Sequence, residues 1–156
     1  MAISKISTNY ADRKLDLHIM QGVHAPNASN ISPSFGKISN YCAGVQKLIQ
    51  RYTIMFLTEI GSQEDYPEFG SDFITKITST SNNFNRSDLF SLFAFANQKV
   101  SDELFDYQIN NDIPLDEQLN VVELNEIVST PDGGVSLKLT IIPRAEQPVE
   151  FLMPLP

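Results

Sequence analysis

The sequence predicts a single α+β domain: three helices packed on a C-terminal antiparallel β-sheet, preceded by an N-terminal strand and an irregular arm. Two observations lead to this prediction. Apolar residues recur at helical spacing over residues 45–56, and they alternate with polar residues over residues 135–141. A chain of 156 residues, 42% of them hydrophobic, is also long and apolar enough to bury one core.

Residues 1–38 are the first predicted region, a strand followed by an extended arm. Leu15, Leu17 and Ile19 alternate with polar residues, which is typical of a half-buried strand over residues 14–21. The arm that follows is rich in Asn, Ser and Ala and is interrupted by prolines, so we expect it to be irregular and exposed. Residues 1–5 lack the apolar core of a secretory signal, which predicts synthesis in the cytoplasm.

Residues 39–156 are the second predicted region and contain all three helices. Ser39 or Asn40 is a candidate cap for the first helix, which we expect to end near Thr58. Gly61 and Pro67 then interrupt the helical pattern. A short second helix is predicted where apolar spacing resumes, over residues 73–77.

The third predicted helix is long, with Ser87 as its expected cap and Asp88 in its first turn. Its apolar row comprises Leu89, Phe93, Ala96, Val100, Leu104 and Tyr107. Three further rings, Phe90, Phe95 and Phe105, widen the apolar surface beyond one stripe. Two interpretations stay open: all the rings enter the domain's own core, or the helix also packs against a second partner.

The last third of the chain predicts a sheet of three strands. Residues 119–128 favour a strand, residues 130–134 a tight turn, and residues 135–141 a strand with one buried face. A final strand is expected over residues 149–155. Pro154 cannot donate a ladder hydrogen bond, which confines this strand to an edge or to the end of the sheet. Such an edge can accept a strand from another chain.

The distribution of charge limits the classes of partner that the chain is expected to bind. A formal net charge of −8 argues against nucleic-acid binding, which needs clustered Lys and Arg. Eight acidic residues lie between Ser101 and Glu126 with no Lys or Arg among them: Asp102, Glu103, Asp106, Asp112, Asp116, Glu117, Glu123 and Glu126. They form either a solvated face or a patch that meets a basic protein. The apolar runs are too short to span a membrane.

Motifs for catalysis and cofactor binding are missing from the sequence. A glycine-rich phosphate loop, a Ser-His-Asp set and an HExxH motif do not occur. Cys42 is the only cysteine, and we expect it to be a small core residue. His18 and His24 without nearby cysteines do not make a zinc site. We therefore predict no cofactor, no metal and no catalytic residue.

The acidic loop after the first helix allows two interpretations. Glu59, Glu64, Asp65 and Glu68 could supply the paired carboxyls of a glycoside hydrolase. Alternatively, the loop is a rigid clasp in which Glu59 accepts hydrogen bonds from the backbone that opens the next helix. Gly61 would then permit the bend, as would Gly70. We prefer the clasp, because four acids on one short loop would be solvated.

This part of the chain resembles a known family. The run GVQKLIQRY…FLTEIGSQEDYPEFGSDF is similar to the baseplate wedge proteins of contractile phage tails, the lysozyme-like wedge family that includes sheath initiators and a type VI secretion baseplate subunit. The matching positions are Gln46, Leu57, Thr58, Gly61, Pro67, Phe69, Gly70 and Ser71. The order of elements agrees from about residue 44 to residue 155, and the resemblance does not cover residues 1–38.

The resemblance implies a structural protein of the virion, assembled in the host cytoplasm, that connects the baseplate wedge to the sheath and templates sheath assembly by strand addition. The implied partners are other wedge proteins and the tail sheath protein, with tail tube proteins as a further candidate and neither nucleic acid nor membrane. The alternatives are a type VI secretion or tailocin baseplate subunit and, less favoured, a muramidase-type hydrolase.

The resemblance also assigns residues to three roles. The structural loop comprises Glu59, Gly61, Pro67, Glu68, Phe69, Gly70 and Ser71. Candidates for the wedge interface are Asp116, Glu117 and Gln118, which stand where the family has Glu-Pro-Arg. Candidates for the sheath interface are Val149, Phe151 and Met153 on the last strand.

Overall fold

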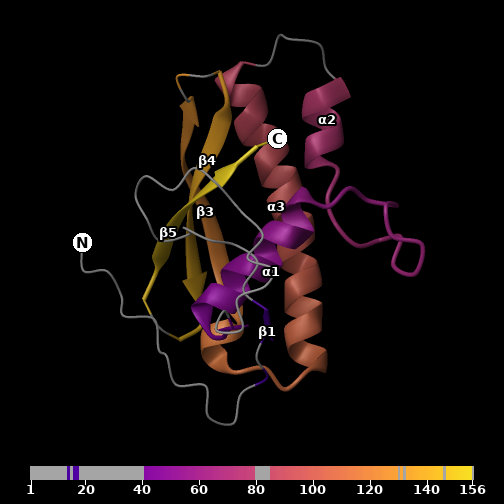
Figure 1. Cartoon of the computed structure of the whole chain (residues 1–156), viewed down its shortest axis with the longest axis vertical. Coiled ribbons are helices and arrows are strands. Elements are labelled where there is room, and N and C mark those ends of the chain that lie inside the picture. The colour runs from indigo at the N-terminus through magenta and orange to yellow at the C-terminus, as the bar shows by residue number, and fades with distance from the viewer. Residues whose placement is uncertain are drawn as a thin grey trace.

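The computed structural model describes residues 14, 16–17, 41–79, 85–129, 131, 133–145 and 147–155. Its α-helices are α1 (Val45–Leu57), α2 (Phe73–Ser79) and α3 (Arg86–Asn110). A short 3₁₀ helix, η1 (Leu115–Glu117), leads into the strands β3 (Leu119–Ser129), β4 (Val135–Pro143) and β5 (Val149–Pro154). These strands form one antiparallel sheet, so the predicted α+β class is confirmed (Figure 1).

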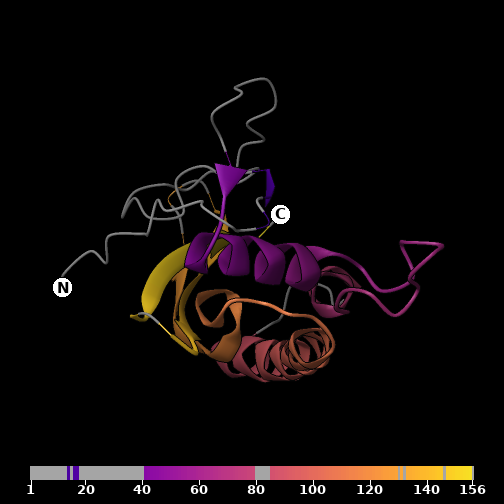
Figure 2. The same cartoon turned by 90° about the horizontal axis from the view of Figure 1, so that it is seen from below.

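The helices lie on one face of the sheet, and the core fills the space between them. The helix α3 runs along the strands, and α1 crosses it obliquely (Figure 1). Viewed from below, α1 and α3 lie one above the other with the sheet beside both (Figure 2). Phe56 of α1 joins the helices at the centre: its ring centroid lies 4.8 Å from that of Phe73 and 5.4 Å from that of Phe93.

The central strand β4 supplies the floor of the core. Leu137, Leu139 and Ile141 are all 0% exposed, as expected for one face of an alternating strand. The sheet order is β3-β4-β5, which places β5 at an edge. The position that Pro154 predicted for the last strand is therefore confirmed.

The hydrogen-bond register shows which backbone groups of β5 face outward. The Leu155 amide donates to the Val135 carbonyl oxygen at 2.9 Å, and the next pairs are Ser136↔Pro154 and Leu137↔Met153. Hydrogen-bonded pairs alternate with non-bonded pairs along an antiparallel ladder. The backbone groups of alternate β5 residues, namely Glu150, Leu152 and Pro154, therefore point away from β4.

The described N-terminal residues differ from the sequence prediction. The strand β1 comprises only Asp16–Leu17 and pairs with β2 (Tyr41–Cys42). Leu17 is 57% exposed, so the expectation that its side chain lies on a buried face is wrong. Lys14 is described but is not in the strand, and residues 15, 18–21 and the whole arm over residues 22–38 lie outside the described residues.

The start of α1 also differs from the prediction. Its N-cap is Gly44, with a φ of 66°, whereas Ser39 and Asn40 lie outside the described residues. The pairing of β2 holds Tyr41 and Cys42 in extended backbone, which delays the helix start until the glycine turns the chain. The end of α1 at Leu57 agrees with the prediction.

The long helix α3 begins with a capping box, but its cap is Asn85 and not Ser87. The Asn85 side chain accepts from the Asp88 amide at 2.9 Å, and the Asp88 carboxylate accepts from the Asn85 amide at 3.3 Å. Asp88 therefore lies in the first turn, as predicted. The helix ends at Asn110.

The aromatic side chains of α3 divide between the core and the surface. Phe93 is buried and Phe105 packs against the core. Tyr107 is 43% exposed, and the guanidinium of Arg51 lies 4.7 Å from its ring centroid. Phe95 is 73% exposed, so the interpretation that every ring of α3 enters the core is wrong.

Candidate functional site

The loop between α1 and α2 projects from the helical layer, and backbone hydrogen bonds join its two ends, which form the base of the loop. Ser71 pairs with Glu59 in a short parallel bridge. The Ile60 amide donates to the Ser71 carbonyl oxygen at 3.2 Å, and the Ser71 amide donates to the Thr58 carbonyl oxygen at 2.8 Å. Above this base the Gly61 amide reaches the Pro67 carbonyl oxygen at 2.9 Å. These backbone bonds hold the two sides of the loop together.

Ser71 performs the capping role that the sequence analysis assigned to Glu59. Its hydroxyl donates to the Phe56 carbonyl oxygen at 2.6 Å and accepts from the Phe73 amide, the first of α2, at 3.3 Å. The Glu59 carboxylate instead accepts from the Thr75 hydroxyl at 2.7 Å. The prediction that Glu59 binds backbone N–H groups of the next helix is therefore wrong, because a closer and smaller side chain occupies that position.

Gly70 is the position where the loop approaches α1 most closely. Its φ is 107°, and a Cβ atom there would overlap the Thr58 carbonyl oxygen. Gly61 has a φ of 81° but open space around it. Both glycines allow the bend, as expected, and only Gly70 is also required by packing.

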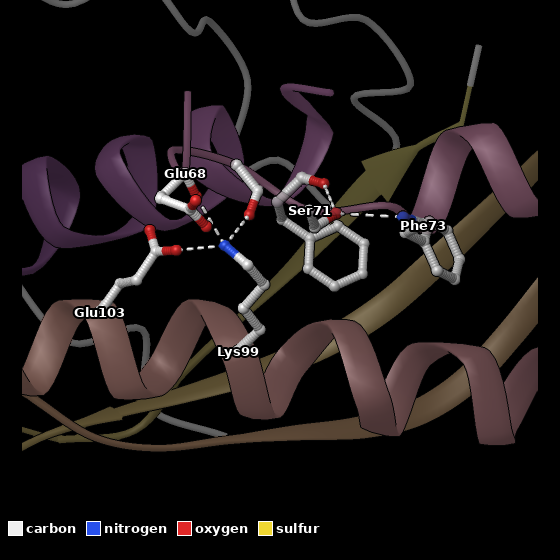
Figure 3. Close-up of polar contacts among 7 residues, drawn as sticks. Glu68, Ser71, Phe73, Lys99 and Glu103 are labelled. Carbon is white, nitrogen blue, oxygen red and sulfur yellow. Dashed lines mark hydrogen bonds and ion pairs between the residues drawn. The ribbon is translucent and has the colours of Figure 1, made fainter. Parts of the chain in front are cut away.

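Lys99 of α3 fixes the loop to the rest of the fold (Figure 3). Its ammonium group donates to the Glu68 carbonyl oxygen at 2.7 Å and to the Gly70 carbonyl oxygen at 2.9 Å. It also forms an ion pair with Glu103, one helical turn away. Sequence reasoning missed Lys99, although its i,i+4 spacing to Glu103 is the signal of a paired lysine.

The part of the loop that faces solvent is acidic. Glu64, Asp65 and Glu68 are exposed, and Tyr66 is 69% exposed. Glycoside hydrolysis places a carboxyl group in an apolar pocket beside the substrate, whereas these carboxylates stand in solvent. The geometry favours the clasp interpretation, with Phe69 packed against the core beneath the loop.

The wedge-interface candidates are buried to different degrees. Glu117 is 2% exposed: it accepts from the Gly44 amide at 3.1 Å and pairs with Lys47 at 3.2 Å. Asp116 is also buried, while Gln118 is half-buried and donates to the Ile113 carbonyl oxygen at 2.6 Å. The Glu117 carboxylate thus accepts a hydrogen bond from the backbone at the start of α1 and neutralises the charge of Lys47. Its role in the described structure is to connect η1 to α1 inside the chain.

Hydrogen bonds from Lys47 and Gln50 connect the N-terminal residues to α1. Lys47 also donates to the Lys14 carbonyl oxygen at 2.7 Å, and Gln50 donates to the Leu17 carbonyl oxygen at 2.8 Å. Side chains of α1 therefore hold the backbone of the first described residues. Sequence reasoning missed this contact, because the partners are 33 residues apart and carry no shared motif.

The sheath-interface candidates Val149, Phe151 and Met153 are 9%, 5% and 0% exposed. Their side chains enter the chain's own core, so the expectation that they contact a neighbour directly is corrected. Alternation along β5 turns Glu150 and Leu152 to the outer face instead. A neighbour could add to this strand only through the backbone and these outward residues.

Cys42 is buried at 0% exposure, which confirms its prediction as a core residue. Burial, aided by the charge of Asp16, raises the pKa of its thiol from 9.0 to about 11. Among the residues that the structure describes, no group of three His, Cys, Asp or Glu side chains is arranged to hold a metal ion. His18 and His24 lie outside those residues.

Comparison with known proteins gives no match: no family model, no curated protein and no solved structure is similar to this chain. Each helix in the described part of the chain is too short or too polar to cross a membrane.

Proposed function

We propose that this chain is a structural subunit of a contractile-tail baseplate that connects the wedge to the sheath and starts sheath assembly by accepting a strand on β5. The supporting observation is the edge position of β5, with the backbone of Glu150 and Leu152 directed away from β4. An open edge binds an extended segment through main-chain hydrogen bonds. The resemblance of residues 44–155 to wedge proteins supplies the assembly context.

The other edge of the sheet is less suited to strand addition. The pairing of β3 with β4 shifts register between Leu119 and Val121 and again between Leu124 and Glu126. Such irregularities are typical of edges protected from pairing. The pairing of β5 with β4 is regular throughout. We therefore assign the acceptor role to β5.

The acceptor edge is short, which suits assembly in a ring. Pro154 has no N–H, so the outward donors of β5 are the amides of Glu150 and Leu152. Each added strand would bind weakly by itself. In a symmetric ring many such contacts act together, and linked binding events gain affinity without any new contact.

The helical half would contact the other wedge proteins. Lys99 and Ser71 fix the α1–α2 loop to both neighbouring helices, so a subunit bound at the loop holds the sheet in a defined orientation. A rigid connection of this kind would transmit the geometry of the wedge to the first sheath ring. Catalysis plays no part in this function.

A seeding experiment tests the proposal. Soluble sheath subunits of the same contractile particle are mixed with a small amount of this chain, and polymerisation is followed by light scattering and electron microscopy. Leu152→Pro removes one outward donor while retaining the pairing with β4, and Leu152→Ala is the matched control that keeps the amide. We expect the parent chain and Leu152→Ala to shorten the lag and Leu152→Pro to lose this effect. A parent chain without effect on the lag, or full seeding by Leu152→Pro, would overturn the proposal.

A further inference from the structure

The side of α3 opposite the core carries two large apolar residues in solvent. Phe95 is 73% exposed and Ile109 is 79% exposed, whereas Val100 and Leu104 on the other side are buried. The helix is otherwise well supported by its capping box and its core contacts. The row formed by Phe95, Asp102, Asp106 and Ile109 is called the α3 outer face below.

The spacing of these residues places them in one row. Phe95, Asp102 and Ile109 are each seven residues apart, and an α-helix drifts by only about 20° over that interval. Asp106 follows Asp102 by one helical turn. The two apolar side chains therefore stand about 21 Å apart along the axis, with both carboxylates between them.

The charge of the α3 outer face is one-sided. Asp102 and Asp106 are exposed, and Asp102 accepts a hydrogen bond from Gln98 at 2.9 Å that leaves its charge uncompensated. The nearest lysine of the helix, Lys99, is directed to the loop carbonyls and to Glu103. A row of apolar, acidic, acidic and apolar residues is thus presented on a rigid support.

We propose that the α3 outer face docks a basic amphipathic helix of another protein. In this arrangement apolar side chains of the partner cover Phe95 and Ile109, and Lys or Arg side chains face Asp102 and Asp106. Buried aromatic anchors carry much of the binding energy at protein interfaces, and complementary charges set specificity and the association rate. The inference concerns α3 alone and does not rest on the assignment to a contractile tail.

Charge complementarity selects this partner over a second copy of the chain. Two α3 outer faces packed together would place aspartates opposite aspartates, and like charges across an interface oppose binding. A polyanionic partner such as a nucleic acid is disfavoured by the same carboxylates. A partner helix with cations between two apolar residues matches both the apolar ends and the acidic centre of the row.

The support for the row is held in place by internal hydrogen bonds, which favours binding. The loop that borders α3 is closed by its own hydrogen bonds and by Lys99. A surface that is already ordered loses little conformational entropy on association. On this side of the interface the ordering cost would then be confined to the side chains of the row.

The test uses two labelled helical peptides and the full chain. One peptide carries leucines about four helical turns apart with lysines on the same face between them, and the other carries glutamates in place of the lysines. Binding is measured by fluorescence anisotropy at low and high salt. We expect the lysine peptide to bind the parent chain, more weakly as salt rises, and the glutamate peptide to bind at least about tenfold more weakly, which corresponds to about 1.4 kcal/mol.

Variants of the chain separate the docking row from general charge. Phe95→Ser and Asp102→Lys are expected to weaken binding of the lysine peptide by at least about tenfold. Glu123→Lys, the same charge reversal on the exposed side of β3, should leave binding nearly unchanged. Circular dichroism checks that each variant is folded.

Three results would overturn the inference. The first is equal binding of the two peptides, which would reveal adhesion without charge recognition. The second is unchanged binding by folded Phe95→Ser. The third is self-association of the parent chain in sedimentation experiments that Phe95→Ser abolishes, because a second copy would then occupy the α3 outer face.

Discussion

At the residue scale, the α1–α2 loop depends on one glycine more than on any of its acids. Gly70→Ala forces a side chain into the Thr58 carbonyl and also into a φ of 107°, whereas Gly61→Ala meets open space at a φ of 81°. We predict a loss of about 3 kcal/mol or more for the first variant and about 1 kcal/mol for the second. Urea unfolding measures both. Equal losses would contradict the close contact between Gly70 and the Thr58 carbonyl oxygen.

Cys42 gives the molecule a pH-dependent contribution to stability. Burial raises the pKa of its thiol from 9.0 to about 11, so the folded state holds this proton more tightly than the unfolded state. The contribution is fully present below pH 9.0 and is lost as the pH rises to about 11. The parent chain should therefore lose stability relative to Cys42→Ala across this interval in urea unfolding. Parallel pH profiles for the two proteins would contradict the prediction.

Several residues of the loop could be predicted from the sequence, because local motifs encode them. The positive φ of Gly61 and Gly70 follows from helix interruption over a short distance, a relation between near neighbours. The partnership of Lys47 with Glu117 could not be predicted. These side chains meet only after the chain folds α1 against η1, and an isolated lysine in an apolar stripe gives no sign of its partner.

At the element scale, the start of α3 offers a direct comparison of two candidate caps. The Asn85 side chain satisfies the Asp88 amide, whereas Ser87 is exposed in the first turn. We predict that Asn85→Ala lowers the free energy of unfolding by about 1 kcal/mol. Ser87→Ala should change it by less than about 0.5 kcal/mol. The reverse order in thermal or urea unfolding would place the helix start two residues later.

Helix and strand existence followed from periodicity, and the positions that the prediction misplaced have local causes. Asn85 and Ser87 are both good caps, and only the capping box with Asp88 decides between them. The start of α1 moved to Gly44 because Cys42 pairs with Asp16, a contact between distant segments. Phe95 is the same residue type as the buried Phe93, so residue type alone does not separate the two. The exposure of Phe95 depends on how far the core extends around the helix.

The inward side of β5 belongs to the core, which determines how its proposed acceptor function can be tested. Its inward side chains Val149, Phe151 and Met153 belong to the core, so removing the strand would remove part of the domain's own stability. Truncation therefore cannot separate folding from assembly. A proline at Leu152 acts on the outward backbone alone, because the inward ladder partners of β4 are Val149, Phe151 and Met153.

At the scale of the whole molecule, three surfaces come from different elements of one fold. The acidic loop projects from the helical layer (Figure 1). The α3 outer face is exposed on the side of the helix away from the core, and β5 is an edge of the sheet that the described strands form. A chain with this arrangement can contact several neighbours at once without rearranging its core. This is the property that a connecting subunit in a large assembly needs.

The proposed function depends on β5 accepting a strand from a neighbouring subunit. An electron cryo-microscopy map of a contractile particle assembled with this chain tests it most directly. We predict an additional extended strand beside β5, within hydrogen-bond distance of the Glu150 and Leu152 amides and belonging to the first sheath ring. A map in which the edge of β5 faces solvent while the sheath is in place would contradict the account.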